Sequence, residues 1–105
     1  MMRQYLAWAI FLVLQNAAFT FVSRARNSAS YMLHAAAALA SNGVWIAAQF
    51  ISLGIIIDAI KSGSWSQRIG VGLFYTTFTM IGSVLMHWIG KNFIEPRNPK
   101  WKVGA

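Results

Sequence analysis

The sequence predicts an all-α fold: a polytopic membrane protein with three transmembrane helices in an antiparallel bundle. Three apolar stretches, residues 5–22, 31–60 and 69–93, fill most of the 105-residue chain, and positive charge is confined to the gaps and ends. A bilayer core about 30 Å thick needs about 20 apolar residues of helix to cross it, and each stretch is near that length or longer. Helices are the expected form because every backbone amide in lipid must be bonded within its own segment.

The composition supports a membrane location. Hydrophobic residues make up 57% of the chain and charged residues only 10%, whereas a soluble domain usually carries about 25% charge. Nine Lys and Arg face two acids, a net charge of +7. These bases stand in ones and twos between apolar spans, which is typical of membrane-flanking anchors and not of a nucleic-acid site. The absence of cysteine excludes disulfides, thiolate zinc sites and thiol catalysis.

The first stretch is predicted to be a retained helix. It follows Arg3 as a signal peptide would, but it runs beyond the ~7–15 residues of a signal-peptide core and has no clean cleavage site after it. A short polar loop, residues 23–30, then leads into the second stretch, with Ser28 and Ser30 as candidate N-caps. So short a connection implies an antiparallel neighbour.

The second stretch is longer than a bilayer requires. Thirty residues make about 45 Å of helix, so we expect this helix to tilt or to start at the interface. Ser41, Asn42 and Gly43 fall in mid-span. This triplet either packs closely against a neighbour or kinks and opens the helix.

A second short loop, residues 61–68, precedes the third stretch. Residues 94–105 contain Pro96 and Pro99 and are predicted to be a short extended basic tail along the lipid headgroups. The whole chain is thus a single membrane domain. The predicted membrane-surface anchors are Arg24, Arg26, Lys91, Arg97, Lys100, Trp101 and Lys102.

Counting bases gives an orientation. With three spans, one side receives three bases and the other receives six, namely those of the first loop, the end of the third helix and the tail. The positive-inside rule then places the first loop and the carboxyl end in the cytoplasm and the amino end outside.

Each predicted helix carries a polar face. In the third, Gly72, Thr76, Thr79, Ser83, His87 and Gly90 recur at spacings of three or four, whereas Leu73, Phe74, Ile81, Leu85 and Trp88 form the expected lipid-facing side. Small residues let helices approach closely, and hydroxyls and amides hydrogen-bond between helices. Such faces either hold the three helices together or line an oligomer or pore. The candidate packing or pore-lining residues are Asn16, Thr20, His34, Ser41, Asn42, Gly43, Gln49, Gly72, Thr76, Thr79, Ser83 and His87.

No motif indicates an enzyme. The chain has no HExxH, GxSxG or phosphate-loop motif, and its two acids, Asp58 and Glu95, lie at different helix ends. Neither His34 nor His87 has a neighbouring ligand at metal-binding spacing. We therefore expect no catalytic activity, cofactor, metal or nucleic-acid partner. Asp58 is expected to pair with a nearby base or to reach solvent.

The run from Ser23 to Ser28, followed by Tyr31, His34 and the segment from Ser41 to Trp45, resembles small uncharacterised membrane proteins of tailed bacteriophages. In size, span count and basic tail the chain is also similar to three-span phage holins. The resemblance implies residence in the host inner membrane and self-association, and hence permeabilisation of that membrane or formation of a pore.

Two alternatives stay open at this point. One is an accessory phage protein that modulates a host membrane protein, for example to exclude superinfecting phage. The other is a small oligomeric ion or solute transporter acting around Asn42, Gln49 and Asp58.

Overall fold

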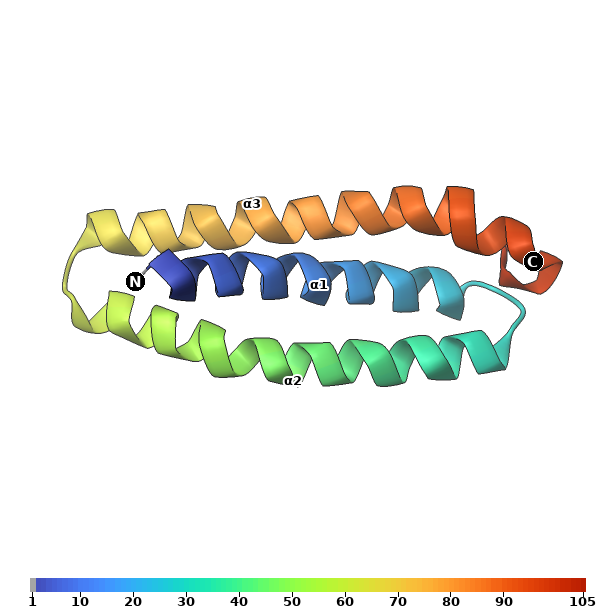
Figure 1. Ribbon diagram of the computed structural model, residues 1–105, viewed down its shortest axis with the longest axis horizontal. Coiled ribbons are helices and arrows are strands. Elements are labelled where there is room, and N and C mark those ends of the chain that lie inside the picture. Colours follow the sequence, from blue (N-terminus) through green and yellow to red (C-terminus); the bar gives the residue numbers. More distant parts are fainter. Residues whose placement is uncertain (1) are drawn as a thin grey trace.

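A computed structural model describes residues 2–105, which form three long helices and a short irregular end. The helices are α1 (Met2–Arg26), α2 (Tyr31–Lys61) and α3 (Trp65–Ile89). The chain runs out along α1, returns along α2 and runs out again along α3 (Figure 1). All three helices are long and apolar enough to cross a membrane, which confirms the prediction of an all-helical fold with three candidate spans.

The three helices form a rod of 51 × 21 × 21 Å, with α1 between α2 and α3. Helix α1 packs along both α2 and α3, whereas α2 and α3 contact each other much less. Serine side chains start the two later helices: Ser30 accepts a hydrogen bond from the Leu33 amide and Ser64 from the Gln67 amide. Gly63, at φ +68°, allows the sharp turn between α2 and α3.

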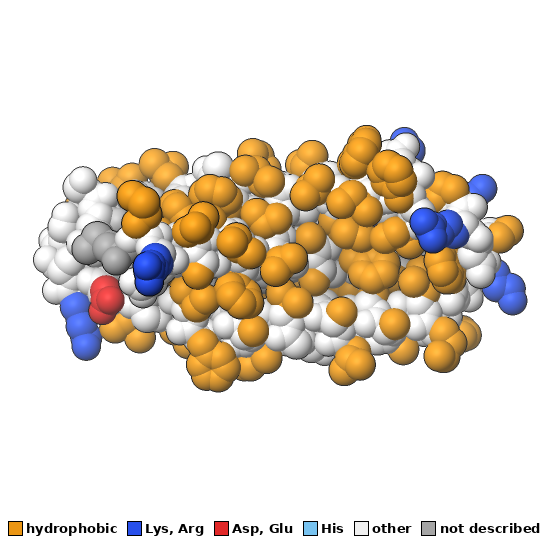
Figure 2. All heavy atoms as spheres, viewed as in Figure 1, with side chains coloured by type: hydrophobic (Ala, Val, Ile, Leu, Met, Phe, Trp, Pro, Cys, Tyr) orange, Lys and Arg blue, Asp and Glu red, His pale blue; other side chains and the backbone are white. Residues whose placement is uncertain are grey.

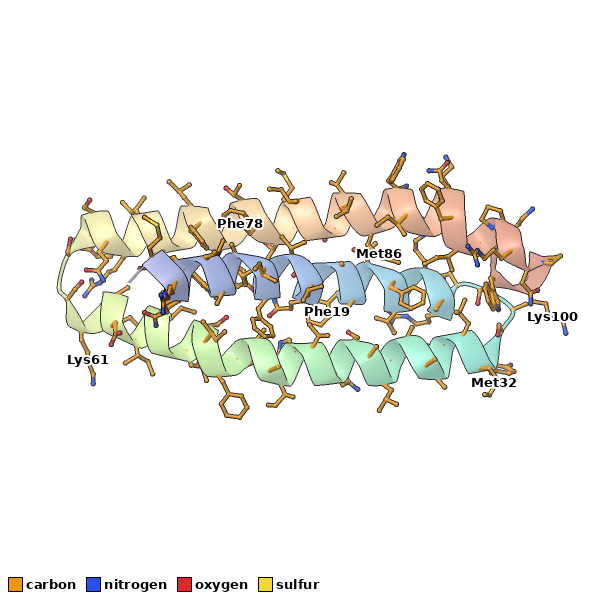
Figure 3. The ribbon with its side chains drawn as sticks, in the orientation of Figure 1. Phe19, Met32, Lys61, Phe78, Met86 and Lys100 are labelled. Atoms are coloured by element: carbon orange, nitrogen blue, oxygen red, sulfur yellow. The ribbon has the colours of Figure 1, made fainter. Side chains whose placement is uncertain are left out.

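The core lies at the amino-terminal half of α1, where Trp8 and Leu12 are fully buried. The Trp8 ring stacks on Phe74 of α3, with 5.0 Å between ring centroids and 8° between planes. The prediction that Phe74 faces lipid was therefore wrong. Helical spacing alone did not show that Phe74 and Phe78 pack against the core that contains Trp8 and Leu12 of α1. Phe78 lies between α3 and α1 (Figure 3).

Helix α2 is continuous from Tyr31 to Lys61, so the Ser41-Asn42-Gly43 triplet does not break it. A glycine inside a helix costs only about 1 kcal/mol relative to alanine. Ser41 itself is buried, as are Ala37 before the triplet and Ala48 after it, so α2 packs inside the bundle on both sides of Gly43.

The prediction of an extended tail was also wrong. After α3 the chain makes a π-helical turn, η1 (Gly90–Ile94), and two 3₁₀ turns, η2 (Glu95–Arg97) and η3 (Pro99–Trp101). Each proline stands in the first turn of a 3₁₀ segment, where it needs no amide hydrogen. The tail then folds back on the α1–α2 loop, where the Ala29 amide donates to the Lys100 carbonyl at 2.9 Å and the Gly104 amide to the Asn27 carbonyl at 2.7 Å.

The surface is divided as a membrane protein requires. Figure 2 shows hydrophobic side chains along the middle of the rod and Lys and Arg side chains at its two ends. The three spans therefore present an apolar belt between two basic ends.

Candidate functional site

Polar side chains of α1 hydrogen-bond to both neighbouring helices. The Trp8 indole donates to Ser52 of α2 at 2.7 Å, inside the core. On the other side, the Asn16 amide donates to Ser83 of α3 at 3.2 Å. Two of the predicted packing residues, Asn16 and Ser83, thus meet between helices.

Gln15 forms a third polar contact, at mid-span. Its side chain is only 1% exposed, and its Nε2 lies 3.4 Å from the Tyr75 hydroxyl of α3. Its Oε1 is buried and has no hydrogen-bond partner within residues 2–105. The sequence places Gln15 deep in the first apolar stretch, where a buried amide needs a protein partner.

The predicted packing or pore-lining residues divide by exposure. Buried are Ser41 and Thr79; partly buried are Asn16, Thr20, His34, Gln49 and Ser83; exposed are Asn42, Gly43, Gly72, Thr76 and His87. The small and polar residues predicted to form one packing face on α3 therefore lie at the border between its buried and its exposed surface. One side of this face packs inside the bundle and the other is left outside.

Gly82 is the packing residue that the sequence reasoning missed. A Cβ atom placed there would overlap the backbone carbonyl of Val13, so the backbones of α1 and α3 approach each other closely at this point. The available signal was the spacing of Gly82 three residues after Thr79, because both residues are buried on the same side of α3.

Asn42 and Gln49 form an outward row on α2. They are seven residues apart and so lie on one side of the helix. Asn42 is exposed and Gln49 is partly buried. No side-chain hydrogen bond joins either amide to another residue among those that the structure describes.

A groove lies between α2 and α3. The groove encloses about 350 Å³ and is lined by Ile56, Ala59, Ile60, Arg68, Val71, Gly72, Tyr75 and Thr76. By helical spacing, Ile56 and Ile60 continue the row of Asn42 and Gln49.

In the same way, Gly72 and Thr76 continue into Ser83 and His87 along α3. Both polar rows therefore flank one side of the bundle. We call this the polar face, defined by Asn42, Gln49, Gly72, Thr76, Ser83 and His87.

Asp58 does not belong to the polar face. It lines a separate depression with Gln4, Tyr5, Ile55 and Gln67. Sixteen residues separate it from Asn42, which is about 24 Å along a helix. The structure therefore does not bring together the three residues of the transporter hypothesis.

The opposite end of the rod holds an ion pair that the sequence did not reveal. Arg24 binds Glu95 through two hydrogen bonds, with Nε–Oε2 at 2.5 Å and Nη2–Oε1 at 3.0 Å. Its Nη1 lies 3.3 Å from Nδ1 of His87, and the Val103 amide donates to Glu95 at 3.2 Å. Arg24, predicted as a surface anchor, thus fastens the tail to α1.

The other predicted anchors surround this end without such a role. Lys100 projects outward (Figure 3). Trp101 is partly buried, and the exposed anchors are Arg26, Lys91, Arg97, Lys100 and Lys102. This end is accordingly the more basic one.

Among residues 2–105, no three His, Cys, Asp or Glu side chains gather where they would hold a metal ion. The polar face instead offers neutral donors and acceptors, which suit contacts between helices or a hydrated path. Comparisons with protein-family models, curated proteins and solved structures gave no match to this chain.

Proposed function

We propose that this protein is a small holin-like membrane protein that assembles through its polar face and makes the membrane permeable. The observation that carries the proposal is the outward row of Asn42 and Gln49, two amides in mid-span without a partner in the described chain. An unpaired amide is costly in hydrocarbon, and lipid tails offer it no hydrogen bond. A hydrogen bond between helices supplies about 0.6–2 kcal/mol.

A second copy of the chain satisfies both amides. Each amide carries donors and an acceptor, so identical residues on two chains complement each other. The polar face also permits close approach, because Gly72 has nothing within 4 Å of the place where a Cβ would lie. Close approach of backbones favours helix association in lipid.

An assembly with the polar faces turned inward would line a path with amides and hydroxyls. The hydrophobic surface seen in Figure 2 would then remain toward lipid. In this arrangement helices from several copies would line a route for ions together, so no single helix has to line a pore alone.

The proposal includes a location and an origin. The similarity to tailed-phage membrane proteins and to three-span holins favours a phage protein in the bacterial inner membrane. The distribution of bases favours an amino end outside and a carboxyl end in the cytoplasm.

The test is expression in bacteria, with membrane potential followed by a voltage-sensitive dye. We expect the natural chain to depolarise the cells, and the double variant Asn42→Leu with Gln49→Leu to leave the potential intact at equal membrane abundance. The matched control is Phe50→Leu with Ile57→Leu, two exposed residues that are also seven apart but lie on a different side of the same helix; this variant should depolarise like the natural chain.

A natural chain that leaves the potential normal at high abundance would contradict the proposal. If such a chain co-purified with one resident membrane protein, the accessory role would take its place.

A further inference from the structure

The groove between α2 and α3 has a basic end and an apolar body. It begins where α2 ends, at Ile60, and where α3 carries Arg68, and it runs inward to Tyr75 and Thr76. Its volume of about 350 Å³ falls within the ~300–1,000 Å³ typical of ligand pockets. It therefore connects the membrane boundary with the hydrocarbon region.

The inner wall of the groove presents few free polar groups. The Thr76 hydroxyl donates to the Gly72 carbonyl at 2.8 Å, so its hydrogen is used within α3. The Tyr75 hydroxyl accepts a hydrogen bond from Nε2 of Gln15 on α1, at 3.4 Å. What remains toward the groove is largely hydrocarbon, including Ile56 and Val71.

Arg68 supplies charge at the outer end. Its Nε and Nη2 donate to the carbonyls of Ala59 and Ile60, at 3.4 and 2.8 Å, and its guanidinium lies 4.9 Å above the Trp65 ring. A guanidinium has five N–H donors, so three remain free. No carboxylate pairs with Arg68 in residues 2–105, where Arg24 with Glu95 forms the one ion pair.

We propose that this groove binds an anionic glycerophospholipid, with one acyl chain along the apolar wall and the phosphate on Arg68. Guanidinium and phosphate match in charge and geometry. Lys61, which projects from the same end of the bundle (Figure 3), adds a second positive charge near the headgroup. Trp65 is exposed at the level where aromatic residues anchor to the interface.

The site is independent of the proposed pore. Its charged part lies at the end of the bundle, whereas Asn42 and Gln49 lie in mid-span. Gly72 and Thr76 line the groove and also belong to the polar face. A single chain already contains the whole groove, so lipid binding requires no assembly.

Native mass spectrometry of the detergent-solubilised protein tests the proposal on the monomer. Phosphatidylglycerol and phosphatidylcholine with identical acyl chains serve as probes. We expect one phosphatidylglycerol to bind more tightly than phosphatidylcholine. Arg68→Gln should weaken phosphatidylglycerol binding about fivefold, the usual effect of one base near a phosphate. Arg3→Gln, which removes the same charge at the same end outside the groove, should leave it unchanged.

A second variant separates shape from charge and does not disturb Arg68. Gly72→Leu should fill the groove and abolish the bound lipid, whereas Gly70→Leu is the matched control. Both glycines are exposed, and neither has an atom within 4 Å of its Cβ position. Equal lipid binding by the two leucine variants would overturn the proposal, as would equal binding of the two phospholipids by the natural chain.

Discussion

At the scale of single residues, Gly82 sets the distance between α1 and α3. Because any Cβ there overlaps the Val13 backbone, Gly82→Ala should destabilise the bundle by about 1–3 kcal/mol, the usual cost of overpacking. Gly70→Ala adds the same methyl group to α3 in open space and should cost nothing, since alanine favours the helix. Thermal denaturation of both variants in one detergent gives the comparison. Equal midpoints would mean that the two helices do not approach closely at Gly82.

The Trp8–Ser52 hydrogen bond is a second residue-scale determinant of stability. Ser52→Ala leaves the indole N–H unpaired in the core, at an expected cost of about 1–3 kcal/mol. Trp8→Phe removes the donor, and the free Ser52 hydroxyl then bonds to its own helix backbone. A double-mutant cycle in detergent should give a coupling energy of about 0.6–1.7 kcal/mol, as for other hydrogen bonds between membrane helices. A coupling near zero would show that the bond is absent.

At the scale of elements, the sequence predicted the features that depend only on residues close together in the chain. The spans 5–22, 31–60 and 69–93 fall within the structure's helical segments because helix length and hydropathy are properties of contiguous residues. Phe74 was assigned to the wrong face and Gly82 was missed. Both errors arose because the roles of these residues depend on how α3 packs against α1. The tail escaped prediction for the same reason, since its turns are stabilised by contacts with a loop about 70 residues earlier.

The link between the tail and α1 gives an element-scale prediction. Glu95→Gln removes the charge that holds Arg24 and weakens the acceptor of the Val103 amide. A loss of about 1–2 kcal/mol corresponds to a factor of about 5–30 in the population of the detached tail. Trypsin should therefore cut after Arg97, Lys100 and Lys102 faster by that factor, as mass spectrometry would measure.

Asp58→Asn is the matched control, because it removes the other acid at the far end of the rod and should leave cleavage of the tail unchanged. If Glu95→Gln and Asp58→Asn were cut alike, the ion pair would not be what fastens the tail.

At the scale of the whole molecule, the two ends of the rod differ in charge. The hydrogen bond between Ala29 and Lys100 places the first loop and the tail at the same end. Six bases then stand at this end and three at the other. One of the six, Arg24, is neutralised by Glu95, which leaves five against three before Asp58 is counted at the opposite end. The charge asymmetry on which the proposed orientation rests thus survives folding.

The absence of cysteine makes this orientation measurable, because one introduced thiol is the only thiol. Ser66 lies in the first turn of α3, at the less basic end of the bundle, and Ala105 lies at the carboxyl end. Both positions are exposed and are replaced by cysteine one at a time, as Ser66→Cys and Ala105→Cys. Since the proposed pore would let reagent into the cell, both substitutions belong in the Asn42→Leu, Gln49→Leu background, where the membrane should stay sealed. A membrane-impermeant maleimide should label Ser66→Cys in intact cells, but Ala105→Cys only after the membrane is opened with detergent, because the more basic end is retained in the cytoplasm. Labelling in the reverse order would contradict the orientation and leave the proposed assembly untouched, since the polar face lies in mid-span whichever end is inside.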